Sequence, residues 1–174
     1  MATCIQIFPG VKVVTFGDGR TATFKAPTDL VLGQALTSAR REPLAMVDVL
    51  IDQCCTEGDK AELKDKIGYV KQLAELTDDL FGKVDASLFW GEGFAFLDFS
   101  DGTKLTLKPC TRKVYEIAQA KAKTNPLNYL KHLLTECAEV AAEADAIKNS
   151  AGHLLGFAGV ADEFTDHTGA YLGN

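Results

Sequence analysis

The sequence lacks the features of a membrane or secreted protein. None of its apolar runs approaches the roughly 20 residues that a membrane-spanning helix needs. The start, Met1–Ile5, has no basic segment followed by a long apolar stretch, so we expect no secretory signal. The five cysteines are odd in number and include no Cys-x-x-Cys pair, which favours free thiols in a reducing cytosol.

Basic residues are too few for a general nucleic-acid binder. Lysine and arginine number 18 against 24 aspartates and glutamates, which gives a formal net charge of −6. Binding to phosphates needs clustered cations. The densest basic stretch, Lys104–Lys123, spans an expected strand and helix and is interpreted as a solvated face. We therefore expect no nucleic-acid partner and no membrane partner.

Motifs of catalysis and nucleotide binding are also missing. The chain has no Gly-x-x-x-x-Gly-Lys-Ser/Thr phosphate loop, no helix-opening Gly-x-Gly-x-x-Gly and no Gly-x-Ser-x-Gly nucleophile elbow. Gly91-Glu92-Gly93 lies between expected strands and is interpreted as a turn. We predict that the protein is not an enzyme, and we assign no residue to catalysis, cofactor binding or metal binding.

What the sequence does contain is an internal repeat. A shift of 83 positions brings Gly10 onto Gly93 and Asp18-Gly19 onto Asp101-Gly102. About 17 residues are identical over roughly 80 positions, where chance would give about 5. The identities fall at turns, helix starts and apolar positions. We predict a tandem duplication, with a first α+β repeat over residues 1–83, a second over 84–167 and an unmatched tail over 168–174.

Each repeat is expected to begin with a three-stranded antiparallel β-meander. The strand-like runs are Cys4–Phe8, Val11–Phe16 and Thr21–Phe24 in the first copy, and Leu88–Trp90, Phe94–Phe99 and Lys104–Leu107 in the second. An Asp-Gly pair separates the last two runs of each copy. That pair predicts a hairpin, because the tight turn needs a residue with positive φ.

Three to four helices are expected to follow each meander. Thr28 and Thr111 are N-cap candidates, and Asn125-Pro126 places proline at the first helical position, where its missing N–H costs nothing. The second helix of each copy is expected to bury an apolar stripe, namely Leu44, Val47, Leu50, Ile51 and Cys54, or Leu127, Leu130, Leu133, Leu134 and Cys137.

The later helical segments of the first copy are expected at about Lys60–Ile67 and Tyr69–Phe81. In the second copy, the corresponding late segment Gly152–Gly159 is rich in glycine. Because each glycine weakens a helix by about 1 kcal/mol relative to alanine, we expect this segment to be broken or bent.

Two groups of residues could hold a metal by residue type alone. His132 and Glu136 lie one helical turn apart. They align with Val49 and Gln53, which are not ligands, so a partly exposed helical position is the preferred interpretation. The second group comprises Asp162, Glu163, Asp166 and His167. It is interpreted as an acidic terminal segment.

The cysteines and aromatic residues carry two further hypotheses. Cys54 and Cys137 are kept by the repeat on its apolar stripe, which fits a buried thiol that acts as a small hydrophobe. A nucleophile would need a neighbouring histidine, and Cys55 beside Cys54 leaves redox or metal sensitivity open. The aromatic segment Phe89–Phe96 fits either core strands or an exposed partner surface.

A family resemblance rests on the strand-to-helix half of each repeat. The quoted segments are TKLTLKPCTRKVYEIAQAKAKTNPLNYLKHLLTEC, TATFKAPTDLVLGQALTSARREPLAMVDVLIDQCC and LAELTDDLFG. With a strand ending near proline, a short helix, and a helix ending in a Leu-Ile-x-x-Cys-like run, they resemble the small tail-assembly chaperones and baseplate-associated proteins of contractile-tailed phages. Here the unit is duplicated.

The resemblance implies a non-enzymatic structural or assembly protein of a phage tail or baseplate. Its partners would be other tail or baseplate proteins, and it would act in the cytoplasm of the bacterial host or within the virion tail. The alternative is an adaptor or ligand-binding module with a site between the two repeats. An enzyme assembled from distant residues and a homo-oligomer also stay open.

Overall fold

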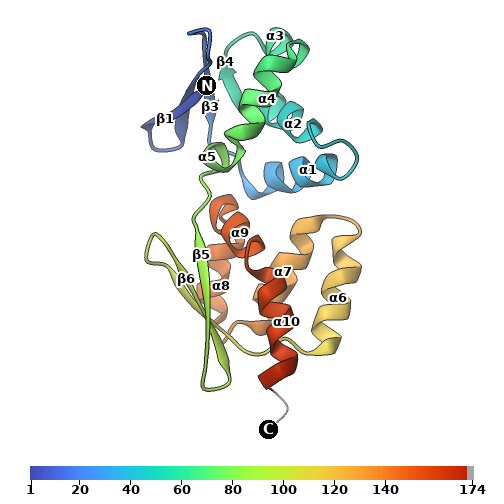
Figure 1. Cartoon of the computed structure of the whole chain (residues 1–174). Coiled ribbons are helices and arrows are strands. Elements are labelled where there is room, and N and C mark those ends of the chain that lie inside the picture. Colours follow the sequence, from blue (N-terminus) through green and yellow to red (C-terminus); the bar gives the residue numbers. More distant parts are fainter. Residues whose placement is uncertain (172–174) are drawn as a thin grey trace. The chain divides into compact units, whose positions relative to one another are not determined.

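The computed structural model describes the backbone of residues 1–171 and the side chains of residues 1–166. The chain forms two compact units, Met1–Gly82 and Lys83–Asn174. Each unit is an antiparallel sheet followed by helices (Figure 1), so the predicted α+β class and the strand-then-helix order are confirmed. The duplication itself stays a prediction. Helix α10 continues to Tyr171, so part of the expected tail is helical, and residues 172–174 lie outside the described residues.

The elements of the two units follow a similar order. Unit 1 holds β1 (Thr3–Phe8), β2 (Val11–Thr15), β3 (Thr21–Lys25), α1 (Asp29–Ala39), α2 (Ala45–Cys54), β4 (Cys55–Glu57), α3 (Lys60–Asp65), α4 (Ile67–Glu75) and α5 (Thr77–Phe81). Unit 2 holds β5 (Ala86–Gly91), β6 (Phe94–Phe99), β7 (Lys104–Leu107), α6 (Arg112–Ala122), α7 (Pro126–Cys137), α8 (Ala141–Lys148), α9 (Ala151–Ala158) and α10 (Ala161–Tyr171).

The predicted Asp-Gly hairpins are confirmed in both units. Each hairpin has a loop of three residues, whose last residue needs a positive φ. That residue is Gly19 or Gly102, with φ of +85° and +91°. Strands β2 and β3 pair Val13 with Thr23, and β6 and β7 pair Phe96 with Thr106. The residues of the second pair lie 83 positions after those of the first, so the two hairpins have the same strand register.

A fourth strand distinguishes unit 1. Its sheet has the order β1-β2-β3-β4, and Cys55 of β4 pairs with Phe24 of β3. At the equivalent place in unit 2, Leu107 and Ala138 form only an isolated bridge. Strand β4 is not predictable from the sequence, because three residues directly after a helix are too few to show strand alternation.

Caps and cores match the predicted helix pattern. The hydroxyls of Thr28 and Thr111 accept the N–H groups of Val31 and Val114, and Asn125 caps α7. The stripes of α2 and α7 are buried at Val47, Leu50, Ile51, Cys54, Leu127, Leu130, Leu133, Leu134 and Cys137. Leu44, also expected in the stripe, is only half-buried.

Two details of the late helices differ from expectation. The segment Tyr69–Phe81 is divided at Leu76 into α4 and α5. Helix α9 runs through Gly152 and Gly156 and ends before Gly159. The expected break within Gly152–Gly159 is therefore not found. A side chain at Gly156 would place its Cβ 1.9 Å from the carbonyl oxygen of Val84. This glycine is therefore explained by close packing against the chain entering β5.

Replacing Gly156 by alanine should destabilise the protein despite alanine's better helix propensity. The clash is with backbone and can be relieved only by moving α9 or Val84, so we expect a loss of about 1–3 kcal/mol of unfolding free energy. Gly68→Ala is the matched control, because a Cβ there meets nothing within 4 Å, and it should stabilise by up to about 1 kcal/mol. Denaturant unfolding measures both; equal effects would contradict the packing explanation.

Candidate protein-interaction surface

Within each unit, helices cover only one face of the sheet (Figure 1). The strand residues that face the helices are buried, namely Val14, Ala22, Phe24, Ala95, Leu97, Leu105 and Leu107. The alternate residues point away from the helices. In antiparallel sheets such a solvent-facing side is normally polar. Here both outer faces carry apolar side chains, which makes them candidates for binding another protein.

The outer face of unit 1 is apolar where β1 and β2 meet. Ile5 pairs with Val13 and Phe8 with Val11, while a β-bulge shifts the register between Gln6 and Phe8. Because a bulge re-aims the side chains around it, Phe8 shares the face of Ile5 instead of alternating away from it. We call Ile5, Ile7, Phe8, Val11 and Val13 the first outer face. Ile5 is 61% exposed and Phe8 is 66% exposed.

The bulge follows from one residue in the adjacent turn. Pro9 holds its own φ near −65°, while Gly10 has a φ of +76°. A type I′ turn, whose twist matches that of the strands, needs a positive φ at both central residues, so Pro9 excludes it. In unit 2, Glu92 and Gly93 have φ of +53° and +83°, as a type I′ turn requires, and β5 pairs with β6 without a shift. The predicted turn at Gly91-Glu92-Gly93 is thus confirmed.

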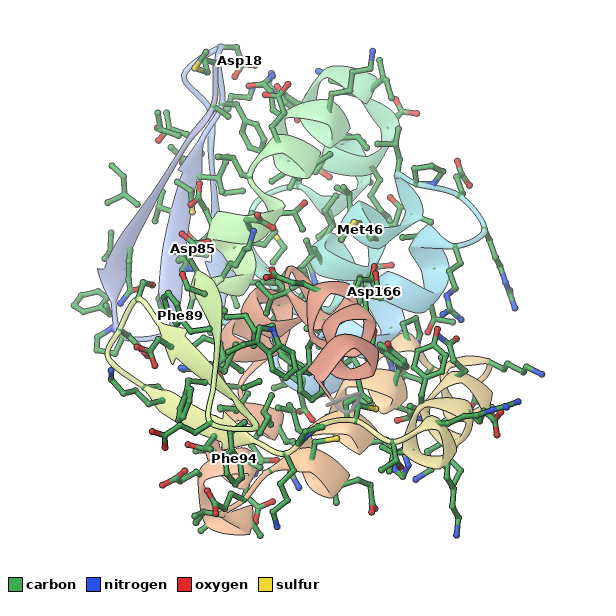
Figure 2. All side chains as sticks on the ribbon, turned by 60° about the horizontal axis from the view of Figure 1, so that its bottom comes forward. Asp18, Met46, Asp85, Phe89, Phe94 and Asp166 are labelled. Carbon is green, nitrogen blue, oxygen red and sulfur yellow. The ribbon has the colours of Figure 1, made fainter. Side chains whose placement is uncertain are left out.

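The outer face of unit 2 is aromatic. Phe89 of β5 lies opposite Phe96 of β6, and Phe94 lies on the same side of β6. Figure 2 shows Phe89 and Phe94 on the β5–β6 hairpin. Phe89 is 55% exposed and Phe96 is 38% exposed. We call Phe89, Phe94 and Phe96 the second outer face.

The aromatic segment Phe89–Phe96 is divided between the core and the exposed side of the sheet, and its role as a partner surface stays a prediction. Ala95 is fully buried against the helices. Trp90 stacks on Phe164 of α10, with ring centroids 5.9 Å apart and the planes 9° from parallel. The three phenylalanines of the second outer face supply the exposed part.

In unit 1, the β2–β3 turn is anchored to α4. The hydroxyl of Tyr69 donates to Oδ2 of Asp18 at 2.6 Å, and the N–H of Gly17 donates to Oε1 of Gln72 at 2.9 Å. The rings of Phe16 and Tyr69 lie 4.7 Å apart. An open pocket of about 540 Å³ lies beside these contacts, between the turn and the start of α4. These interactions hold the hairpin against the helical layer.

In unit 2, His153 of α9 anchors the equivalent turn. Its Nε2 lies 3.0 Å from Oδ2 of Asp101, and its Nδ1 lies 2.7 Å from the hydroxyl of Ser150. This cluster was not predicted from the sequence, because its members come from a turn and a distant helix. The only available signal was the aspartate kept in both Asp-Gly turns.

The Asp101–His153–Ser150 chain has the residue types of a hydrolase triad, but its geometry has a structural explanation. The Ser150 hydroxyl caps α9 by accepting the N–H of His153. Nε2 of His153 also lies 3.3 Å from the hydroxyl of Thr103, in the same turn as Asp101. Capping and turn anchoring thus account for both ring nitrogens of the histidine.

His132 is buried, so the expectation of a partly exposed position is wrong. It is 8% exposed, because α6 packs against its side of α7. Its Nδ1 lies 2.9 Å from Nζ of Lys121 and 3.9 Å from Oε1 of Glu136. Burial, followed by the charge of Lys121, lowers the pKa of His132. The neutral imidazole accepts from the lysine and lines an open pocket of about 420 Å³.

The remaining candidate ligands do not form a metal cluster among the described side chains. No group of three histidine, cysteine, aspartate or glutamate residues is close enough there to hold a metal. Asp162, Glu163 and Asp166 lie on α10. The side chain of His167 falls outside the described residues.

All five cysteines are free thiols, and four of them are buried. Cys54 and Cys137 end α2 and α7 in the two cores, as a small hydrophobe would. Burial raises the pKa of Cys54 and Cys55. Cys137 interacts by a side-chain hydrogen bond with Cys110, and this contact with burial raises the pKa of Cys137. These environments do not activate Cys54 or Cys137 as a nucleophile.

Comparisons with protein-family models, curated proteins and solved structures find no match for this chain. No helix among residues 1–171 is long and apolar enough to span a membrane.

Removing the Tyr69 hydroxyl should produce a pH-dependent loss of stability. Its hydrogen bond is the largest cause that lowers the pKa of Asp18. A lowered carboxyl pKa stabilises the fold above the unfolded value of about 3.9, and this is lost as pH falls through the folded value. The gap between wild type and Tyr69→Phe should thus be widest near neutral pH and narrow below about pH 4.

Denaturant unfolding between pH 7 and pH 3 measures that gap. Tyr115→Phe is the control, because the Tyr115 hydroxyl accepts from Gln119 on an exposed helix face. Its effect should not change over this range. A Tyr69→Phe effect that is equally flat would show that the Asp18 contact does not contribute.

Thiol labelling of the folded protein should separate Cys4 from the other cysteines. Cys4 is half-exposed, whereas Cys54, Cys55, Cys110 and Cys137 are buried. We expect iodoacetamide to modify Cys4 under native conditions and the other four only after unfolding, as read by peptide mass spectrometry. Prompt native labelling of Cys54 or Cys137 would contradict the core assignment.

Proposed function

We propose that the chain is a non-enzymatic structural or assembly protein that acts through protein contacts. Its binding surfaces are the two outer faces. The supporting observation is that both sheets leave apolar side chains on the face that no helix of their unit covers. Burying one large apolar side chain contributes about 1.5–3 kcal/mol, so a group of such residues can supply the central anchors of a larger interface.

Position in the sheets strengthens this proposal. Ile5 and Val13 in unit 1, and Phe89 and Phe96 in unit 2, are directly opposed pairs on the first two strands. An isolated exposed hydrophobe is ordinary, but grouped ones mark interaction sites. Both units group them on the same side of the sheet.

The resemblance to tail-assembly chaperones and baseplate-associated proteins supports a phage setting for this role. Under this proposal the partners are other tail or baseplate proteins. The protein then acts in the cytoplasm of the bacterial host or becomes part of the virion tail. The alternative, an adaptor or ligand-binding module with a site between the repeats, stays a prediction.

Affinity capture from phage-infected or prophage-induced bacterial lysate tests this role. We expect tagged wild-type protein to recover tail-tube, tape-measure or baseplate proteins, identified by mass spectrometry. The double variant Phe89→Lys, Phe96→Lys removes two aromatic contacts and should reduce recovery at least about tenfold, equivalent to about 1.4 kcal/mol.

The double variant Ala142→Lys, Ala146→Lys is the matched control, since it adds the same two charges at exposed positions of α8. It should leave recovery unchanged. If the wild type captures no tail protein and is absent from virions, the proposal is wrong. Equal recovery by all three proteins would show that the second outer face is not a binding surface for tail proteins.

A further inference from the structure

Strand β1 is a long, open edge of the unit 1 sheet. The strand order is β1-β2-β3-β4, so β1 pairs only with β2. It has six residues, whereas β4 at the opposite edge has three. Five of the six residues are exposed. The backbone N–H and C=O groups on the free side of β1 can therefore pair with another strand.

Natural sheets usually guard such an edge with charge, proline or a short strand. Strand β1 has the sequence Thr-Cys-Ile-Gln-Ile-Phe, with no charged residue and no proline. Its exposed side chains include Ile5, Ile7 and Phe8, all large and apolar. The equivalent strand β5 also has six residues and no charge or proline, but only two of its residues are exposed. Of the two first strands, β1 is the more exposed one.

We propose that β1 pairs antiparallel with β1 of a second copy of this chain. The two unit 1 sheets then join into one continuous sheet across a two-fold axis. This inference rests on the proposed function and deepens it, since it names one protein that the first outer face binds.

The composition of β1 favours itself as a partner. Two-fold pairing sets the strand opposite its own sequence, and an uncharged strand does so without like-charge contacts. An axis at Gln6 places Ile5 opposite Ile7 and Cys4 opposite Phe8. Gln6 then faces its own copy, where each side-chain amide both donates and accepts. The apolar first outer faces of the two copies also become continuous, which buries Ile5 and Ile7 further.

The mass of the protein in solution is the first test. Sedimentation at micromolar concentration should give twice the 18.7 kDa of the chain. Ile5→Lys brings like charges close to the axis and should weaken the dimer at least about tenfold. Because Ile5 is 61% exposed, the variant chain should still fold and keep the wild-type circular dichroism. Ser87→Lys, at an exposed position of β5, is the control and should stay dimeric.

A cross-link tests the axis independently. In a Cys4→Ser background, Gln6→Cys would set two thiols across the axis at a Cα separation of about 4.5–5.5 Å, within disulfide range. Oxidised glutathione would accept the two electrons and two protons as the disulfide forms. A non-reducing gel should show a covalent dimer, whereas Ser87→Cys in the same background, on exposed β5, should stay monomeric.

Each outcome bears on a definite statement. A wild-type monomer at all concentrations, an undiminished Ile5→Lys dimer, or equal cross-linking through Ser87→Cys would overturn the β1 interface. A monomer that still captures tail proteins through Phe89 and Phe96 would overturn this interface and leave the proposed function intact. A β1 dimer that captures no tail protein would support the interface and overturn the phage role.

Discussion

A sheet has two faces, and in each unit the helices bury only one of them. Helix α2 packs against β3, and α8 and α9 pack against β7 and β5. Inward residues of the strands, such as Phe24 and Leu107, are therefore buried. A two-layer domain built in this way has no second helical layer to cover the other face. The exposure of Ile5, Phe8, Phe89 and Phe96 follows from that constraint.

The polar contacts of the two units serve this same layering. In unit 1, Tyr69 donates a hydrogen bond to Asp18 of the β2–β3 turn. In unit 2, His153 lies beside Asp101 of the β6–β7 turn. Both connect a sheet to the helix behind it, although one is a phenol and the other an imidazole. The Asp101–His153–Ser150 chain, which most resembles a catalytic site, therefore connects the sheet to the helical layer.

Local rules predicted the local features of this fold. The Asp-Gly turns and the threonine caps depend on a few neighbouring residues, and the structure has them where the sequence indicated. The burial of His132, the close approach of Gly156 to Val84 and the contacts of His153 depend on segments far apart in the chain. Strand β4 was missed because three residues carry no periodicity. Of the candidate surface, the sequence indicated the aromatic segment but could not show which of its residues face outward.

Pro9 has a consequence for how the exposed and the buried side of a sheet can vary independently. Its ring excludes the turn found at Glu92, and the resulting bulge changes which side chains of β1 reach the outer face. The β2–β3 pairing, which supports the core, keeps the register seen in unit 2. A single turn residue can thus change the exposed side of a sheet while the strand pairing that supports the core is kept. The two sides of such a sheet can therefore vary separately, since the turn sets one and the hairpin register sets the other.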